Sequence, residues 1–100
     1  MSDSVDSNTA QSQWYVYLLC CADNTYYAGV TTDCERRVRQ HNGLIKGGAR
    51  YTQARRPVRI VWYEPCDDRS SACKREAQLK KLTRAQKAAL IKLQSTAQPA

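Results

Sequence analysis

Two tyrosines, one arginine and the only histidine of the chain follow one another closely: Tyr17, Tyr27, Arg37 and His41. The tyrosines lie in apolar, strand-like segments, whereas Arg37 and His41 are four residues apart in a helix-like segment and so share one helix face. Hydrolysis of a phosphodiester needs a cation opposite the developing negative charge and a group that takes a proton from water. Arg37 can supply the cation, and a tyrosine or His41 can take the proton. The competing interpretation is that the tyrosines pack in the core and that Arg37 is a solvated helix residue.

One acidic residue, Glu76, interrupts the apolar face of a later helix. That helix is predicted over residues 70–82, with an apolar stripe at Ala72, Cys73, Leu79 and Leu82. Glu76 lies four residues after Ala72 and three before Leu79, so it is expected to project from the buried side. A carboxylate in that position is costly unless a cation or hydrogen-bond donors satisfy it. Its partner is therefore either a buried arginine or a divalent cation, since Mg²⁺ is commonly held by one or two carboxylates together with waters.

The net charge of +7 is concentrated in two segments. Eight basic residues lie between Asp33 and Arg59, and eight more lie between Arg69 and Lys92. Basic charge keeps proteins soluble, but two such segments favour a polyanionic partner, most commonly a phosphate backbone. The candidate contacts to backbone phosphates, without base recognition, are Lys46, Arg50, Arg55 and Arg56. Gly29 is either a β-bulge or a point where the backbone approaches the substrate closely.

Apolar periodicity and turn signals predict an α+β fold with the order β-β-α-β-α-α. Strands are predicted over residues 14–21, 26–32 and 58–64, the last enclosed by Pro57 and Pro65. One helix is predicted from Thr32 or Asp33 to Asn42, and the next from Asp68 or Ser70 to Leu82. A capping box at residues 83–86 then predicts a separate helix that ends near Leu93. The connection 43–57 has room for one helical turn.

The loop between the first two strands decides whether Tyr17 and Tyr27 face the same way. Asp23 and Asn24 mark a turn there, because both residue types tolerate turn geometry and bond their own backbone. A loop of two residues would place the tyrosines on opposite faces, and one of three or five residues would place them on the same face. The sequence alone leaves both open.

The chain is predicted to form one domain, residues 14–93, between disordered tails at 1–13 and 94–100. Residues 1–13 lack the layout of a signal peptide, and no apolar run is long enough to cross a bilayer, so a cytoplasmic protein without a membrane partner is expected. The five cysteines form no CxxC pair and are expected to be reduced, mostly buried thiols rather than metal ligands.

An ordered set of motifs resembles the GIY-YIG nuclease superfamily. The matching residues are "YVY" at 15–17, "YAG" at 27–29, Arg37 ten positions after Tyr27, and Glu76 on a later helix. The segments "RRVRQHN" and "GGARYT" are similar to those of small, stand-alone members and of catalytic subunits of structure-specific nucleases. The resemblance covers residues 14–92. The sequence departs from the family at Tyr15, which replaces glycine, at Ala28, which replaces isoleucine, and in having no late asparagine after Asn42.

The resemblance implies a three-stranded antiparallel sheet flanked by helices and an endonuclease that cleaves DNA in repair, recombination or processing. It implies one divalent metal at Glu76 and places Arg37 opposite the scissile phosphate. Tyr17 becomes the general base and Tyr27 a positioning or alternative acid–base residue, while His41 orients Tyr17 or the water. The hairpin loop must then have odd length.

Two alternatives of another class remain. In the first, the chain is a nucleic-acid-binding module that cleaves poorly or not at all. In the second, it is a catalytic subunit that depends on a protein partner, or on a second copy of itself, for substrate binding.

Overall fold

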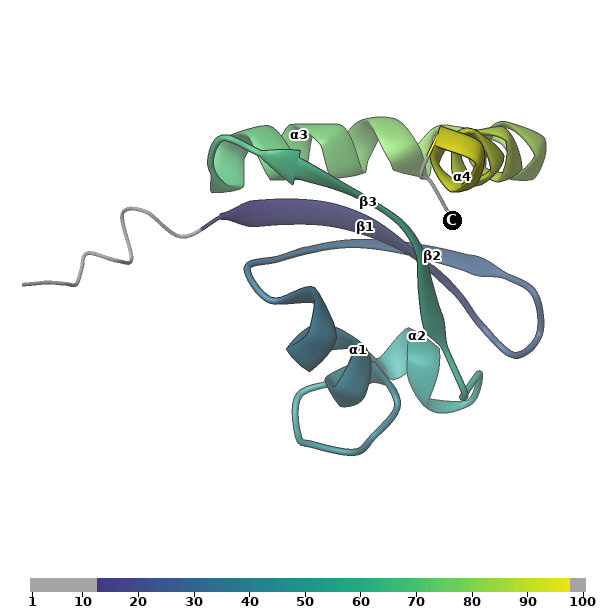
Figure 1. Cartoon of the computed structure of the whole chain (residues 1–100). Coiled ribbons are helices and arrows are strands. Elements are labelled where there is room, and N and C mark those ends of the chain that lie inside the picture. Colours follow the sequence, from purple (N-terminus) through teal and green to yellow (C-terminus); the bar gives the residue numbers. More distant parts are fainter. Residues whose placement is uncertain (1–12, 98–100) are drawn as a thin grey trace, which may run out of the picture.

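A three-stranded antiparallel sheet with the strand order β2-β1-β3 lies at the centre of the molecule (Figure 1). The structure is a computed structural model, and it describes residues 13–97. Its elements are β1 (Trp14–Cys20), β2 (Tyr26–Thr31), α1 (Cys34–His41), α2 (Arg50–Gln53), β3 (Arg59–Cys66), α3 (Arg69–Lys80) and α4 (Arg84–Ala97). The predicted α+β class and element order are confirmed. The additional α2 is the single helical turn expected in the connection 43–57.

The hairpin of β1 and β2 has a loop of odd length. Cys20 pairs with Tyr26, which leaves five residues, 21–25, in the loop. Asp23 closes the turn by accepting hydrogen bonds from the backbone N–H and the hydroxyl of Thr25, and Asn24 adopts a positive φ of 66°. Tyr17 therefore pairs with Gly29, and Tyr27, two residues before Gly29, faces the same side of the sheet as Tyr17. The register that the family resemblance required is confirmed.

Alternation along β1 divides the core into two layers. One layer contains Val16 and Leu18 with Ala28, Trp62 and Leu79, and α3 and α4 pack against it. The other layer contains Tyr17 and Leu19 on the opposite face, with Val38 of α1. Figure 1 shows α3 and α4 on one side of the sheet and α1 and α2 on the other. The face that carries both tyrosines is thus the face that α1 covers.

Strand β3 continues past the predicted stop at Pro65. Pro65 pairs with Tyr15, and the strand ends at Cys66. Proline is tolerated here because β3 is an edge strand, so a missing N–H on its outer side breaks no ladder. A register shift opposite Leu18 and Leu19 leaves Val61 unpaired, as in a β-bulge.

Side-chain caps set the helix starts. Asp33 accepts from the N–H of Arg36, Asp68 accepts from that of Ser71, and the predicted capping box forms between Thr83 and Gln86. Helix α3 ends at Lys80, two residues before the predicted end.

The predicted C-terminal tail was wrong for residues 94–97. Helix α4 runs to Ala97, because the amide of Gln94 accepts from the N–H of Tyr63 and donates to its carbonyl, at 3.1 and 2.6 Å. The side chain thereby occupies backbone groups on the outer edge of β3, as a fourth strand would. Residues 98–100 and residues 1–12 of the predicted N-terminal tail lie outside the described part of the chain. Gln13 is anchored, because its amide donates to the carbonyl of Cys66.

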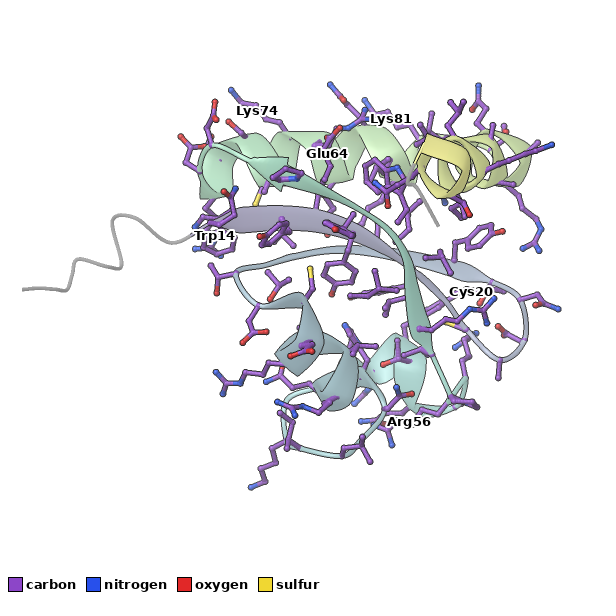
Figure 2. The ribbon with its side chains drawn as sticks, viewed as in Figure 1. Trp14, Cys20, Arg56, Glu64, Lys74 and Lys81 are labelled. Atoms are coloured by element: carbon purple, nitrogen blue, oxygen red, sulfur yellow. The ribbon has the colours of Figure 1, made fainter. Side chains whose placement is uncertain are left out.

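No helix within residues 13–97 is long and apolar enough to cross a membrane. All five cysteines are free, and only Cys20 and Cys21 are buried, so the prediction of mostly buried thiols was wrong for the exposed Cys73. Basic side chains project from both layers: Figure 2 shows Lys74 and Lys81 pointing away from the sheet on the α3 side and Arg56 at the opposite end of the molecule.

Candidate active site on the α1 face of the sheet

Helix α1 brings Arg37 and His41 onto the phenol of Tyr17. The Tyr17 hydroxyl is 2.9 Å from Nε2 of His41, and it accepts a longer hydrogen bond, 3.4 Å, from Nε of Arg37. Tyr17 is 1% exposed and His41 is fully buried. Because the two α1 residues are four apart, one helix face delivers both to the same hydroxyl. Three of the five residues predicted to be catalytic are therefore in direct contact.

Gly29 gives the phenol its space. A Cβ at Gly29 would lie 2.6 Å from Cζ of Tyr17 and closer still to the hydroxyl oxygen. Any side chain at this position would push the phenol away from His41, since neither backbone can yield within the sheet. Of the two interpretations offered by the sequence, close approach describes the glycine better than a bulge, because the β1–β2 register is regular through Gly29. The group that approaches it here is Tyr17, and contact with a substrate stays a prediction.

Burial shifts both partners toward their neutral forms. Burial raises the pKa of Tyr17 to about 12, and the Arg37 guanidinium opposes that rise. Burial also lowers the pKa of His41 to about 4, and the charges of Arg37 and Arg56 add to the effect. Near neutral pH the pair is thus a phenol beside an uncharged imidazole, and the nearby positive charge belongs to Arg37.

The lowered pKa of His41 predicts a loss of stability in acid. Its pKa is about 4 in the folded chain and 6.5 ordinarily, so the unfolded chain binds the proton more readily. The free energy of unfolding should fall as pH drops from 6.5 to about 4, by on the order of 3 kcal/mol from this residue. Denaturant unfolding at several pH values measures this fall. His41→Gln, which cannot titrate, should show a flatter profile over the same window, and identical profiles would contradict the assignment.

Tyr27 completes the aromatic part of the site without a hydrogen bond. Its half-buried ring meets the His41 ring edge-on at 5.4 Å between centroids and stacks on the ring of Tyr51 at 5.4 Å. Within the described residues its hydroxyl has no hydrogen-bond partner, so it is available to a ligand. Four of the five predicted residues, Tyr17, Tyr27, Arg37 and His41, thus form one cluster.

The segment 43–53 contributes residues that sequence reasoning missed. Thr52 is fully buried, and its hydroxyl lies 3.0 Å from Nδ1 of His41. Gly47 accepts a 2.7 Å hydrogen bond from Nη1 of Arg37, and Gln40 accepts another at 2.8 Å from the same nitrogen. The motif "GGARYT" contains Gly47 and Thr52, but its pattern does not indicate that either residue would contact Arg37 or His41.

The fifth predicted residue, Glu76, stands apart from this cluster. It lies on α3, on the other side of the sheet, and is paired with Lys80 at 3.4 Å, with 23% of its side chain exposed. The prediction that a buried arginine pairs with Glu76 is therefore wrong, because the partner is Lys80. Burial is the main cause of the raised pKa of Tyr17, and the negative charge of Glu76 adds a small contribution in the same direction.

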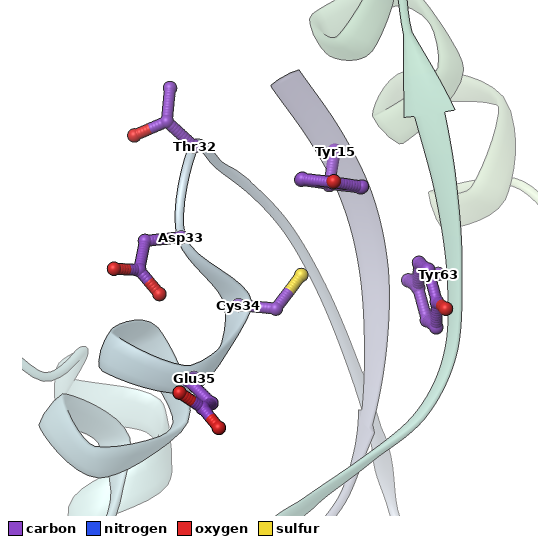
Figure 3. A pocket seen from close by; sticks show the side chains of 6 residues that line it. All are labelled: Tyr15, Thr32, Asp33, Cys34, Glu35 and Tyr63. Atoms are coloured by element: carbon purple, nitrogen blue, oxygen red, sulfur yellow. The ribbon is translucent and has the colours of Figure 1, made fainter. Parts of the chain in front are cut away.

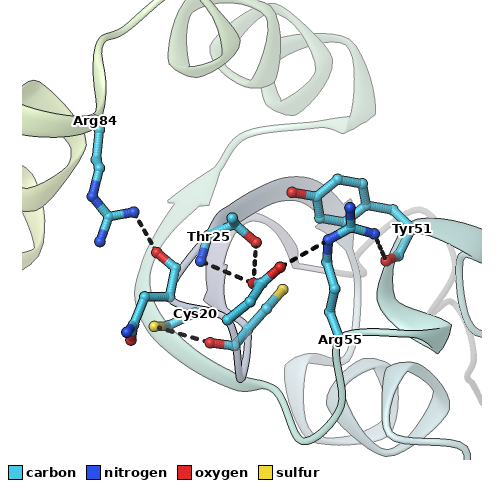
Figure 4. A network of polar contacts seen from close by, with 8 residues as sticks. Cys20, Thr25, Tyr51, Arg55 and Arg84 are labelled. Atoms are coloured by element: carbon cyan, nitrogen blue, oxygen red, sulfur yellow. Dashed lines mark hydrogen bonds and ion pairs between the residues drawn. The ribbon is translucent and has the colours of Figure 1, made fainter.

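The four predicted phosphate contacts divide into two pairs. Lys46 and Arg50 are exposed. Arg55 is paired with Asp23 at 3.2 Å, donates to the carbonyl of Tyr51 and covers the Tyr51 ring at 4.0 Å, while Arg56 donates to the carbonyl of His41 at 2.7 Å. Figure 4 shows the contacts of Arg55, which tie the β1–β2 loop to α2, and the hydrogen bond from Arg84 of α4 to the carbonyl of Asn24 in the same loop. Arg55 and Arg56 therefore stabilise the fold, since they connect α2 and the residues after it to the β1–β2 loop and to α1. Any contact of these two residues with DNA stays a prediction.

A pocket near the start of α1 is chemically different from the cluster. It is lined by Tyr15, Thr32, Asp33, Cys34, Glu35 and Tyr63 (Figure 3). Two of its six lining residues are acidic and none is basic, so it repels rather than attracts a phosphate.

Comparison with known proteins gives this geometry a family. The family model described as the GIY-YIG catalytic domain matches residues 13–89. The chain belongs to the GIY-YIG family. Its GIY-YIG domain is 49% identical over 84 residues to a UPF0213 protein of Desulfotalea psychrophila, covering 84% of this chain and 76% of that one. It is 51% identical over 81 residues to a UPF0213 protein of Syntrophus aciditrophicus, covering 81% and 92%.

Two solution NMR structures share the fold of this GIY-YIG domain. A protein of E. faecalis is 41% identical with a TM-score of 0.56, covering 88% of this chain and 92% of that one. A UPF0213 protein of Bacillus halodurans is 38% identical with a TM-score of 0.51, covering 81% and 84%. The resemblance read from the motifs is confirmed, and a GIY-YIG catalytic domain implies a nuclease that acts on DNA.

The donor set of this GIY-YIG domain fits a metal only in the manner of magnesium. Within residues 13–97, no three His, Cys, Asp or Glu side chains converge as a zinc or calcium site requires. Mg²⁺ is commonly bound by one or two carboxylates together with waters and substrate phosphates. Glu76 suits that mode, because it is a partly exposed carboxylate whose ion pair with Lys80 is exposed and weak.

Proposed function

We propose that this chain is a metal-dependent endonuclease that hydrolyses phosphodiester bonds in DNA, in repair, recombination or processing. One observation carries the proposal: an arginine lies against a buried phenol–imidazole pair. No carboxylate within residues 13–97 pairs with Arg37, whose guanidinium is held by the neutral acceptors Gln40 and Gly47. An arginine without a carboxylate partner is strongly attracted to phosphate, to which it can bind in a bidentate manner.

Tyr17 acts as the general base through its neighbour. Because its pKa is about 12, the phenol carries its proton near neutral pH and cannot accept another without losing it. His41 Nε2, 2.9 Å away, takes that proton as the phenol oxygen removes one from the attacking water. The water oxygen bonds to phosphorus, the bond to the leaving ester oxygen breaks, and solvent returns a proton to that oxygen. Arg37 stabilises the charge that develops on the phosphate.

Substrate binding also opens access to Tyr17. The phenol is 1% exposed and Arg37 occupies its outer lone pair with a long, weak hydrogen bond of 3.4 Å. When Arg37 turns to a phosphate it releases that lone pair to the water. The Tyr17 hydroxyl is therefore reached by water only when a phosphate is bound.

Glu76 is the carboxylate that would hold the divalent cation. Bound there, Mg²⁺ or Mn²⁺ would supply Lewis-acid stabilisation of the negative charge on the phosphate. Glu76 would bind the metal after its ion pair with Lys80 has broken. Lys46 and Arg50 contact the DNA backbone on either side of the scissile phosphate. Tyr27, stacked on Tyr51, orients the water or the phosphate through its hydroxyl.

The test uses supercoiled plasmid and branched DNA with Mg²⁺ or Mn²⁺, each with an EDTA control and a salt series. An endonuclease converts the plasmid to nicked and linear forms only when metal is present. A binding module retards the DNA without cutting it, with an affinity that falls steeply as salt rises. Cleavage that appears only on branched DNA would identify structure as the substrate feature, and cleavage that needs an added protein would favour the partner-dependent subunit.

A further inference from the structure

The hydroxyl of Thr52 fixes which nitrogen of His41 carries the proton. Thr52 Oγ1 has one proton, and it donates that proton to the carbonyl of Ala49 at 2.8 Å, which can only accept. The 3.0 Å contact between Thr52 Oγ1 and His41 Nδ1 must then be donated by His41. Nδ1 therefore bears a hydrogen.

The consequence reaches Tyr17 through the ring. An uncharged imidazole has one N–H, so a hydrogen on Nδ1 leaves Nε2 with its lone pair. The 2.9 Å contact to Tyr17 must then be donated by the phenol, and the phenol oxygen keeps lone pairs to accept from Arg37. All four hydrogen bonds, from Ala49 to Arg37, can be satisfied in this one arrangement.

The opposite tautomer cannot be accommodated. With the hydrogen on Nε2, Nδ1 and Thr52 would face each other as two acceptors, because the Thr52 proton is already committed to Ala49. Tyr17 would meet a donor at Nε2 and would have to send its own proton elsewhere in a space where it is 1% exposed. A buried polar group left without a partner is costly, so the fold excludes this arrangement.

We infer that Thr52 is a positioning residue, which keeps His41 in the tautomer whose Nε2 can receive the proton of Tyr17. The inference deepens the proposed function, on which its catalytic part rests. Thr52 is suited to the task by its place: it is fully buried in the short α2, and its hydroxyl bonds back to the carbonyl that precedes that helix. The His41 ring is thus tied at both nitrogens, to α2 on one side and to β1 on the other.

The tautomer can be measured directly, because His41 is the only histidine of the chain. Nitrogen-15 spectra of the imidazole, on the full chain at pH 7, distinguish the protonated ring nitrogen from the unprotonated one. We expect the wild type to show a hydrogen on Nδ1 and none on Nε2. A wild-type ring with its hydrogen on Nε2 would overturn the inference without any variant and without any assay of cleavage.

Matched variants distinguish the role of the Thr52 hydroxyl in setting the His41 tautomer from the role of the side chain in packing. Thr52→Ser keeps the hydroxyl and should keep the Nδ1–H tautomer. Thr52→Val keeps the branched shape but removes the hydroxyl, and should shift the ring toward the Nε2–H form. In assays of DNA cleavage, Thr52→Val should lower kcat by about tenfold to a hundredfold with little change in KM. Thr52→Ser should keep kcat near the wild-type value.

The outcomes distinguish the inference from the function on which it builds. If Thr52→Val keeps Nδ1–H, or cleaves as fast as the wild type, the positioning role is wrong. If the wild type shows the expected tautomer but cuts no DNA with Mg²⁺ or Mn²⁺, the endonuclease proposal fails and the structural role of Thr52 stands. Should Thr52→Val not fold, the wild-type and Thr52→Ser spectra still decide.

Discussion

Tyr17→Phe is expected to lower the rate of DNA cleavage by a factor of about 10² to 10⁴, the range that proton transfer by a positioned side chain supplies. The ring is retained, so its packing over Gly29 and against Leu19 should survive. Only the oxygen that takes the proton from water is removed. Single-turnover rates on a cleavable DNA, at saturating enzyme, measure the effect on chemistry without the contribution of binding.

The matched control for this variant is Tyr15→Phe. Tyr15 lies two residues earlier on the same strand, and its ring meets that of Tyr63 at 5.9 Å. The rate of Tyr15→Phe should stay within about a factor of two of the wild type, because within residues 13–97 the Tyr15 hydroxyl makes no hydrogen bond to Tyr17, Arg37 or His41. Tyr17→Phe leaves the acceptor of His41 unpaired, which costs about 1–3 kcal/mol of stability, so both variants should be compared well below their melting temperatures. Equal rates for Tyr17→Phe and the wild type would remove Tyr17 from the mechanism.

Glu76→Gln is expected to reduce metal-dependent cleavage by at least about a hundredfold, because loss of Lewis-acid stabilisation is worth several kcal/mol in the transition state. The amide keeps the size of the side chain but loses the charge that binds a hard cation. Raising the concentration of Mg²⁺ or Mn²⁺ should recover part of the rate if waters and substrate phosphates complete the site. The measurement is the cleavage rate as a function of metal concentration.

Glu64→Gln provides the control for charge alone. Glu64 is paired with Arg75 at 2.9 Å on β3, and its loss also changes the net charge by one unit. Its metal dependence should match that of the wild type. If both variants shift the metal dependence equally, Glu76 acts through the overall field of the protein rather than as a ligand.

The meeting of Arg37 with His41 on one face of α1 could be predicted from the sequence, because it follows from helix spacing. Arg37 and His41 are four residues apart, and this spacing alone put them together. The five-residue loop could not be read from Asp23 and Asn24, since turn residues fit loops of several lengths. It needed the family resemblance, which demanded that Tyr17 and Tyr27 share a face.

Contacts between distant segments escaped prediction. Thr52 lies in a connection without periodicity, and its burial depends on the packing of α2 against α1. The end of α4 was placed too early because Gln94 looks like the start of a polar tail, whereas its partner Tyr63 is 31 residues away in sequence. Pro65 seemed to end β3 only because an edge position, which permits proline, cannot be recognised before the strand order is known.

Glu76 shows how far helical periodicity goes. The pattern correctly placed it between the buried Ala72 and Leu79, and it predicted an unusual carboxylate. It did not predict that Lys80, one turn later, would be the partner, because lysine was counted as a surface residue.

The central claim is that Arg37 is the group that meets the scissile phosphate, because it lies beside the Tyr17–His41 pair and has no carboxylate partner among residues 13–97. The most direct measurement compares wild type with Arg37→Met on supercoiled plasmid in Mg²⁺, following nicking and DNA affinity in the same samples. Methionine keeps much of the aliphatic stem and removes only the guanidinium. We predict that the wild type nicks the plasmid, that the variant loses at least about a hundredfold in rate, and that its affinity for DNA falls by less than about tenfold. Nicking by Arg37→Met at the wild-type rate would contradict the account.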